Sequence, residues 1–184
     1  HLRLAQELRR LDRLEESVEY NKKAVALAPD VLGWRLALAD VNEAGLRETL
    51  EMAREVGGEG FAQRCDVRDY SQLTALAQAC EERFGGIDVV VNNAGVALGG
   101  EFEQVSADDF DWLMSINFGA VVRLTRVFLP LLEQSQAAQI VNMSSIFGII
   151  APPGQTAYSA SKFAVRGYSE ALRHELEAEQ RQGR

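Results

Sequence analysis

Apolar residues along the chain recur in two alternating patterns. From residue 34 onward, short apolar runs of strand length alternate with stretches whose apolar residues recur every three or four positions, as on one face of a helix. Strands are predicted at Trp34–Ala39, Phe61–Cys65, Ile87–Val91 and Gln139–Ser144, and helices after Asn42, over Ser71–Phe84, from Ser106 to about Gln134 and from Ala157 to about Gln180. This alternation predicts an α/β protein in which helices cover both faces of a parallel sheet.

Polar and glycine residues mark the ends of these elements. Asn42 and Ser106 are of the type that caps a helix N-terminus, while Gly57-Gly58 and Gly85-Gly86 are typical helix ends. The strand Ile87–Val91 is short and wholly apolar, which predicts burial on both of its faces.

The first 32 residues follow a different pattern. Residues 2–28 are predicted to be helical, since Leu4, Leu8, Leu11, Leu14, Val18 and Val25 recur at helical spacing. Asp12 could begin a second short helix, which would split the stretch in two, and Pro29-Asp30 ends it. We therefore divide the chain into a helical segment, 1–32, and an α/β domain, 33–184.

Composition narrows the class of protein. Of 184 residues, 47% are hydrophobic and 25% charged, and the net charge is −8. These fractions are those of a soluble globular domain, and no apolar run approaches the ~20 residues that span a bilayer. The negative charge argues against nucleic acid as a partner. Cys65 and Cys80 match neither a zinc cluster nor a disulfide framework, so we expect free thiols, no metal site and a cytoplasmic location.

Four polar groups stand at the predicted carboxyl ends of strands, where parallel sheets bind ligands. They are Asp40, Asp66, Asn92-Asn93 and Ser144-Ser145. An acidic residue such as Asp40 can accept the hydroxyls of an adenosine ribose, but it can equally cap the following helix. Both interpretations of Asp40 stay open on this evidence.

Tyr158 and Lys162 are four residues apart on a predicted helix and therefore share one face. A lysine ammonium beside a phenol favours the phenolate, which suits a group that gives a proton to a carbonyl oxygen and takes it back in reverse. A Tyr-x-x-x-Lys pair alone is weak evidence, because most such pairs are surface residues of amphipathic helices.

Taken together, these motifs resemble the short-chain dehydrogenase/reductase family over residues 33–184. The resemblance is carried by Asp40, Cys65-Asp66-Val67, Asn92-Asn93-Ala94-Gly95, Asn117, Val141-Asn142-Met143-Ser144-Ser145 and Tyr158-Ser159-Ala160-Ser161-Lys162, in that order and at the family's spacing. It implies a Rossmann-like sheet and hydride transfer between a nicotinamide cofactor and a small alcohol or ketone.

The resemblance also implies a role for each matching residue. Tyr158 would exchange the proton and Ser145 would hold the substrate oxygen, whereas Asn117 would hold a water or merely satisfy a helix kink. Lys162 would bind the nicotinamide ribose and tune Tyr158. The implied cofactor contacts are Asp40, Asp66, Val67, Asn92, Ala94, Gly95, Tyr158 and Lys162.

Two further expectations follow from the resemblance. Asp40, followed by Val41 rather than arginine, favours NAD over NADP, because a carboxylate repels a 2′-phosphate. The helices at 106–134 and 157–180 form the family's usual dimer interface, so we expect a homodimer.

The sequence departs from the family at its start. The family's glycine-rich turn G-x-x-x-G-x-G, whose backbone N–H groups hold the pyrophosphate, is absent before residue 45. In its place, residues 14–29 resemble the second helix of a tetratricopeptide repeat, as in a chimera. If the four predicted strands close up, their order becomes 2-1-3-4, as in a flavodoxin-like sheet.

Three functions therefore remain open. The first is an oxidoreductase of the short-chain dehydrogenase type, impaired in this chain by weak cofactor binding. The second is a catalytically inactive Rossmann-like scaffold that retains the motifs. The third is an interaction module that uses the N-terminal helices.

Overall fold

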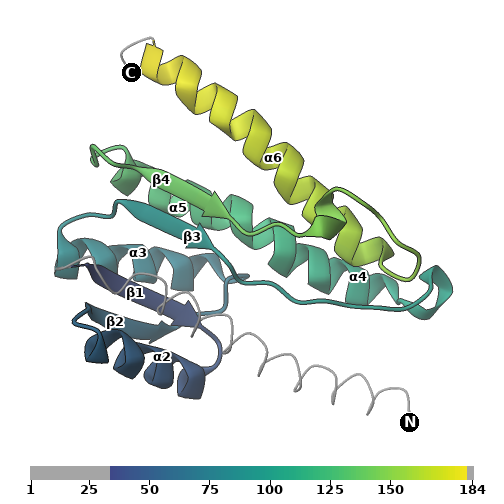
Figure 1. Cartoon of the computed structure of the whole chain (residues 1–184), viewed down its shortest axis with the longest axis horizontal. Coiled ribbons are helices and arrows are strands. Elements are labelled where there is room, and N and C mark those ends of the chain that lie inside the picture. The colour runs from purple at the N-terminus through teal and green to yellow at the C-terminus, as the bar shows by residue number, and fades with distance from the viewer. Residues whose placement is uncertain (1–33, 182–184) are drawn as a thin grey trace. The chain divides into compact units, whose positions relative to one another are not determined.

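The computed structural model describes residues 34–181 (Figure 1). The helix predicted for residues 2–28, and with it the tetratricopeptide-like segment, lies outside the described residues. The described chain falls into two units, one ending at Phe84 and the other beginning at Gly85.

Unit 1 consists of two β-α pairs. Its elements are β1 (Arg35–Asp40), α2 (Glu43–Glu55), β2 (Glu59–Arg64) and α3 (Tyr70–Phe84). The two strands pair in parallel, with Arg35 beside Glu59 and Asp40 beside Arg64. Both strands therefore end at the same edge of their sheet.

The two predicted helices of unit 1 are confirmed, and its strands differ from the predicted ones by one or two residues at their ends. The Asn42 side chain caps α2 by accepting hydrogen bonds from two backbone N–H groups, and Gly57 follows the helix at φ +84°, a conformation that favours glycine. Leu46, Thr49 and Ala53 of α2 and Leu73, Leu76, Ala77 and Cys80 of α3 are buried. The helical spacing of these residues thus places them in the core.

Unit 2 holds two strands, three α-helices and three short turns of other helix types. Its elements are β3 (Val89–Asn92), a 3₁₀ turn (Phe102–Gln104), α4 (Ala107–Met114), a π-helical turn (Ser115–Gly119), α5 (Ala120–Leu132), β4 (Gln139–Asn142), a second 3₁₀ turn (Ile146–Gly148) and α6 (Thr156–Arg181). Strands β3 and β4 pair in parallel, with Val91 beside Val141. Both end next to the segments that carry the predicted site residues (Figure 1).

The single helix predicted from Ser106 is divided by the π-helical turn. Ser106 caps its start as predicted, by accepting a hydrogen bond from the Asp109 backbone N–H. Among the described helices, the stretch Ala107–Leu132 is long and apolar enough to cross a membrane by length and composition alone. Its α5 part packs on β3 and β4, and core helices of soluble proteins pass the same test.

Two expectations about the sheet are wrong. The described strands form two separate pairs, β1 with β2 and β3 with β4, so the closed order 2-1-3-4 is not formed. Strand β3 is also buried on one face only: Val90 faces the core, whereas Val89 and Val91 are 48% and 55% exposed. The physical reason is that α5 covers one face of the β3–β4 pair, and the period of two in a strand turns alternate residues to the other face.

Candidate active site

The centre of the candidate site is the first two turns of α6. Tyr158 and Lys162 lie one turn apart, and the Lys162 Nζ is 5.7 Å from the centroid of the Tyr158 ring. Lys162 is only 6% exposed, and its ammonium donates a hydrogen bond of 2.9 Å to the Met143 carbonyl at the end of β4. Burial lowers the pKa of Lys162, because desolvation disfavours the charged form.

Phe147 connects Ser145 to this pair. The Phe147 backbone N–H donates a 3.2 Å hydrogen bond to the Ser145 Oγ, and its ring packs edge-to-face on the Tyr158 ring at a centroid distance of 6.0 Å. Because Ser145 accepts this bond, its own hydroxyl proton can be donated elsewhere. The structure thus brings Ser145, Tyr158 and Lys162 into one neighbourhood. Phe147 was missed in the sequence, where its only signal is an aromatic residue two positions after Ser145.

The turn that carries Ser145 lies close against α6, where Gly148 and Ser144 meet the backbone of Lys162. The Ser144 Oγ donates a hydrogen bond to the Lys162 carbonyl, at 3.2 Å. A Cβ on Gly148 would stand 2.6 Å from the Ser144 Oγ and 2.9 Å from that same carbonyl oxygen. Only glycine fits this position without displacing the turn, and the turn carries Ser145.

Asn117 lies in the π-helical turn and is almost completely buried. Its Oδ1 accepts a hydrogen bond from the Val96 N–H, and its Nδ2 donates to the Val96 carbonyl, both at 2.8 Å. The Nδ2 also donates to the Ser161 Oγ, at 3.1 Å. Asn117 therefore clamps the segment after β3 to α6.

The residues after β3 complete this side of the site. A Cβ on Gly95 would be 3.5 Å from the Asn117 Oδ1 and 3.7 Å from the Lys162 Nζ, so Gly95 lies directly beside both groups. Ala94, which precedes it, is half-buried. The Nδ2 of Asn92 donates to the Asn142 Oδ1 at 2.7 Å, while the buried Asn92 Oδ1 has no hydrogen-bond partner among the described residues.

The remaining predicted residues, Asp40, Asp66 and Val67, belong to unit 1. One oxygen of Asp40 accepts a 2.9 Å hydrogen bond from the Asn42 N–H, so Asp40 orders the turn before α2 while Asn42 is the cap itself. Asp66 is bound by the Arg68 guanidinium through both of its oxygens, and these hydrogen bonds hold the pKa of Asp66 below its usual value.

Unit 2 carries polar groups that fit the ribose of a nicotinamide nucleotide. The Lys162 ammonium has three N–H donors, of which the Met143 carbonyl takes one, so donors remain for ribose hydroxyls. The unpaired acceptor of Asn92 is a further polar group of the kind that a ligand or water satisfies. In unit 1, the Asp66 carboxylate is paired with the Arg68 guanidinium at 2.6 Å.

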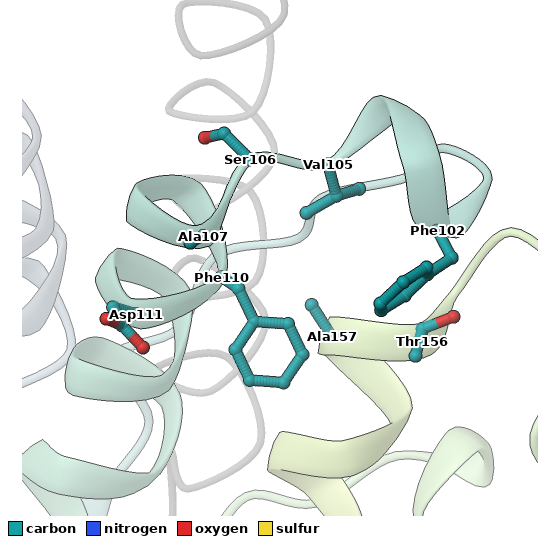
Figure 2. Close-up of a pocket in the computed structure, with 8 residues that line it drawn as sticks. All are labelled: Phe102, Val105, Ser106, Ala107, Phe110, Asp111, Thr156 and Ala157. Atoms are coloured by element: carbon teal, nitrogen blue, oxygen red, sulfur yellow. The ribbon is translucent and has the colours of Figure 1, made fainter.

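A pocket of about 280 Å³ lies beside the first turn of α6. It is lined by Phe102, Val105, Ser106, Ala107, Phe110, Asp111, Thr156 and Ala157. Figure 2 shows the rings of Phe102 and Phe110 directed into it, with Ala157 between them. Its lining is mainly apolar, and its one ionisable side chain, Asp111, is acidic.

Paired parallel strands with flanking helices, and a serine, a tyrosine and a lysine close to the strand ends, are the arrangement of the Rossmann-like class of α/β proteins. A model of the short chain dehydrogenase family matches residues 23–180. The chain belongs to this family. The match begins within the segment that was interpreted as a tetratricopeptide-like helix, and it gives that interpretation no support.

Similar proteins agree with this assignment. A Mycobacterium tuberculosis protein named as the oxidoreductase SadH is 41% identical over 84% of this chain and 56% of its own length. A short chain dehydrogenase/reductase from Burkholderia phymatum, solved in complex with NAD, is 41% identical, with a TM-score of 0.75 over 78% of this chain and 52% of that one. NAD⁺-bound xylitol dehydrogenase is 26% identical, with a TM-score of 0.80 over 86% of this chain and 60% of that one. The chain thus spans little more than half the length of these relatives.

Proposed function

We propose that this chain carries the proton-transfer centre of an NAD-dependent oxidoreductase that interconverts a secondary alcohol and a ketone. The observation that carries the proposal is the convergence of Ser145, Tyr158 and Lys162 through Phe147 and the Met143 carbonyl. When bound, a nicotinamide dinucleotide supplies or accepts the hydride.

In the reducing direction, Tyr158 gives its phenolic proton to the carbonyl oxygen of the substrate as that oxygen becomes a hydroxyl. Ser145 donates a hydrogen bond to the same oxygen and so stabilises the charge that develops on it. Lys162 would hold ribose hydroxyls with the N–H donors that the Met143 carbonyl leaves free, one helical turn from Tyr158. In the oxidising direction the phenolate takes the proton back.

Asn117 supports this centre through its hydrogen bonds to neighbouring segments. Because its side chain is engaged with Val96 and Ser161, its first task is to position the segment after β3 beside Lys162. The predicted role in holding a water that connects Lys162 to solvent stays a proposal.

For the cofactor we propose NAD rather than NADP. The Asp40 carboxylate at the end of β1 would accept hydrogen bonds from the ribose hydroxyls. Its charge would repel a 2′-phosphate. Gly95 and Ala94, which follow β3, would lie along the same dinucleotide with Asn92, Asp66 and Val67.

We expect residues 1–184 alone to bind this cofactor weakly. The glycine-rich turn is absent before residue 45, and each missing charge-assisted hydrogen bond to the pyrophosphate costs roughly 1.5–3 kcal/mol. The loss of several such hydrogen bonds would raise the Kd for the cofactor by several powers of ten.

Titration with NADH, followed by the fluorescence of the bound cofactor, tests the proposal. Binding that is weakened by Asp40→Ala, together with ketone reduction that is lost in Tyr158→Phe, would support it. If NADH does not bind even at millimolar concentration, the chain is the inactive scaffold. Capture of peptides by the N-terminal segment, unaffected by Tyr158→Phe, would instead favour the interaction module.

The assembly and location of the protein are also proposals. We propose a homodimer formed through α4–α5 and α6, which carry the apolar residues Leu124, Val127, Phe128 and Leu131, and Phe163, Ala164, Tyr168 and Leu172. Phe128 and Leu131 are buried against the unit itself, so the interface would use the other residues. A monomeric mass in light scattering at tens of micromolar would contradict the dimer. Two free, buried cysteines suit a reducing, cytoplasmic environment.

A further inference from the structure

Three exposed isoleucines follow Ser145 within five residues. Ile146, Ile149 and Ile150 are 59%, 61% and 52% exposed. The backbone N–H groups of Ile149 and Ile150 both donate to the Ile146 carbonyl, so the three residues form a single turn directly after Ser145. We name them the isoleucine turn. Exposed apolar side chains gathered in this way mark a surface that meets an apolar ligand or partner.

The isoleucine turn contacts the proposed catalytic tyrosine, Tyr158, through Phe147. Phe147, within the turn, packs its ring on Tyr158 and donates its backbone N–H to Ser145. The isoleucine turn thus begins directly after Ser145 and contacts Tyr158 through Phe147.

The segments around the two hydroxyls carry almost no charge. Residues 134–161 contain no Asp, Glu, Lys, Arg or His, and residues 93–100 contain none either. The two segments are joined by a 2.9 Å hydrogen bond from the Gly100 N–H to the Gly154 carbonyl. The nearby cation, Lys162, is buried and bound to the Met143 carbonyl, and the adjoining pocket adds only the carboxylate of Asp111.

From these observations we infer that the site selects neutral ketones and secondary alcohols with an apolar alkyl or aryl chain, and excludes substrates that carry a carboxylate or phosphate. An anionic group that lost its hydration here would find no positive side chain in these two segments to pair with. Burying an unpaired charge is costly. An apolar chain would instead cover the isoleucine turn. The inference rests on the proposed oxidoreductase function and names its substrate class.

Methyl NMR of the 184-residue chain with labelled isoleucine Cδ1 tests this without cofactor or turnover. The two ligands are 2-octanone and 7-oxooctanoate, which have the same eight-carbon skeleton and differ by the terminal carboxylate. We expect 2-octanone to shift the signals of the isoleucine turn and to leave those of Ile87, Ile116 and Ile140 unchanged. From 2-butanone to 2-octanone, affinity should rise by up to about fourfold per methylene. The keto acid should bind at least about tenfold more weakly than 2-octanone.

A charge-reversal variant sharpens the test. Ile149→Lys places a cation beside the site, so 7-oxooctanoate should gain affinity and 2-octanone should lose it. Val56→Lys is the matched control, since Val56 is a similarly exposed apolar residue of unit 1 at the end of α2 and the change in net charge is the same. Both ligands should bind the control as they bind the parent.

The outcomes separate this inference from the proposed function. If 2-octanone leaves the isoleucine turn unshifted, or if the keto acid binds as well as the ketone, the substrate class is wrong even where NADH is oxidised. If Ile149→Lys changes only the molecular mass in light scattering, the turn is a contact between copies and the inference is overturned. Tyr158→Phe should abolish turnover yet keep the methyl shifts, so failure of the redox reaction alone leaves the ligand result standing.

Discussion

Gly148 offers a direct test of how closely the Ser145 turn must lie against α6. Replacing it with alanine adds a Cβ 2.9 Å from the Lys162 carbonyl oxygen and 2.6 Å from the Ser144 Oγ. To reach an ordinary contact distance of about 3.4 Å, the new Cβ and the Lys162 carbonyl oxygen must separate by about 0.5 Å, so the turn or the helix moves. The Cβ and the Ser144 Oγ must separate by more. Because Lys162 is the neighbour, the movement falls on the active site itself.

The expected cost follows from that displacement. Overpacking of a tight interior contact costs about 1–3 kcal/mol, and each kcal/mol lowers the Tm of a chain of this size by roughly 2–4 °C. Since a shift of about 1 Å can cost on the order of 100-fold in rate, half that shift should slow ketone reduction by about tenfold. Stability and activity should therefore fall together in Gly148→Ala.

Thermal and urea unfolding measure the first effect, and NADH-dependent ketone reduction measures the second. Gly167→Ala is the matched control, because Gly167 lies in α6 with no atom within 4 Å of its added Cβ. Alanine favours the helix there by about 0.5–1 kcal/mol, so the same chemical change should be stabilising. A Gly148→Ala protein that unfolds like Gly167→Ala would refute the close approach of Gly148 to the Lys162 carbonyl.

Three further expectations concern other buried groups. Lys162→Met should abolish turnover; it also removes a desolvated charge, which contributes a gain in the free energy of unfolding of about 1 kcal/mol at neutral pH against the loss of the hydrogen bond to the Met143 carbonyl. Burial lowers the pKa of Lys162 in the folded chain, so this gain should shrink as the pH rises through that pKa toward the unfolded value of about 10.4; a pH-independent gain would contradict the cause. Asn117→Ala should destabilise the chain by about 1–3 kcal/mol in urea unfolding, since Val96 loses partners for both backbone groups, and an unchanged midpoint would contradict the clamp. Burial raises the pKa of Cys65 and Cys80 to about 11, so both thiols should react with a disulfide reagent at pH 8 about 100-fold more slowly than a free thiol until the chain is unfolded, and rapid reaction in the native state would show them to be accessible.

The helices of unit 1 could be predicted because local rules agree with tertiary packing there. A polar cap at Asn42, glycines at the helix end and apolar residues at helical spacing each specify the same element. The order of chemically distinct motifs along the chain was likewise sufficient to indicate the family, and the family match confirms it.

The sheet could not be predicted in the same way. An apolar run such as Ile87–Val91 indicates a buried strand, but it does not reveal how many layers cover it. In the structure α5 covers one face, and the strands pair two by two. Strand pairing depends on which edges meet in space, and this information is non-local.

What the sequence by itself determined about this protein is the succession of strands and helices, the caps that bound them, and a serine, an asparagine, a tyrosine and a lysine at positions typical of one family. Only the tertiary structure decided that Asn117 sits in a π-helical turn bound to Val96, that Lys162 reaches the Met143 carbonyl, and that Phe147 joins Ser145 to Tyr158. Periodicity and capping act over a few neighbouring residues and can be read along the chain. Hydrogen bonds between residues 19 to 44 positions apart exist only once the backbone has folded and brought the groups into contact.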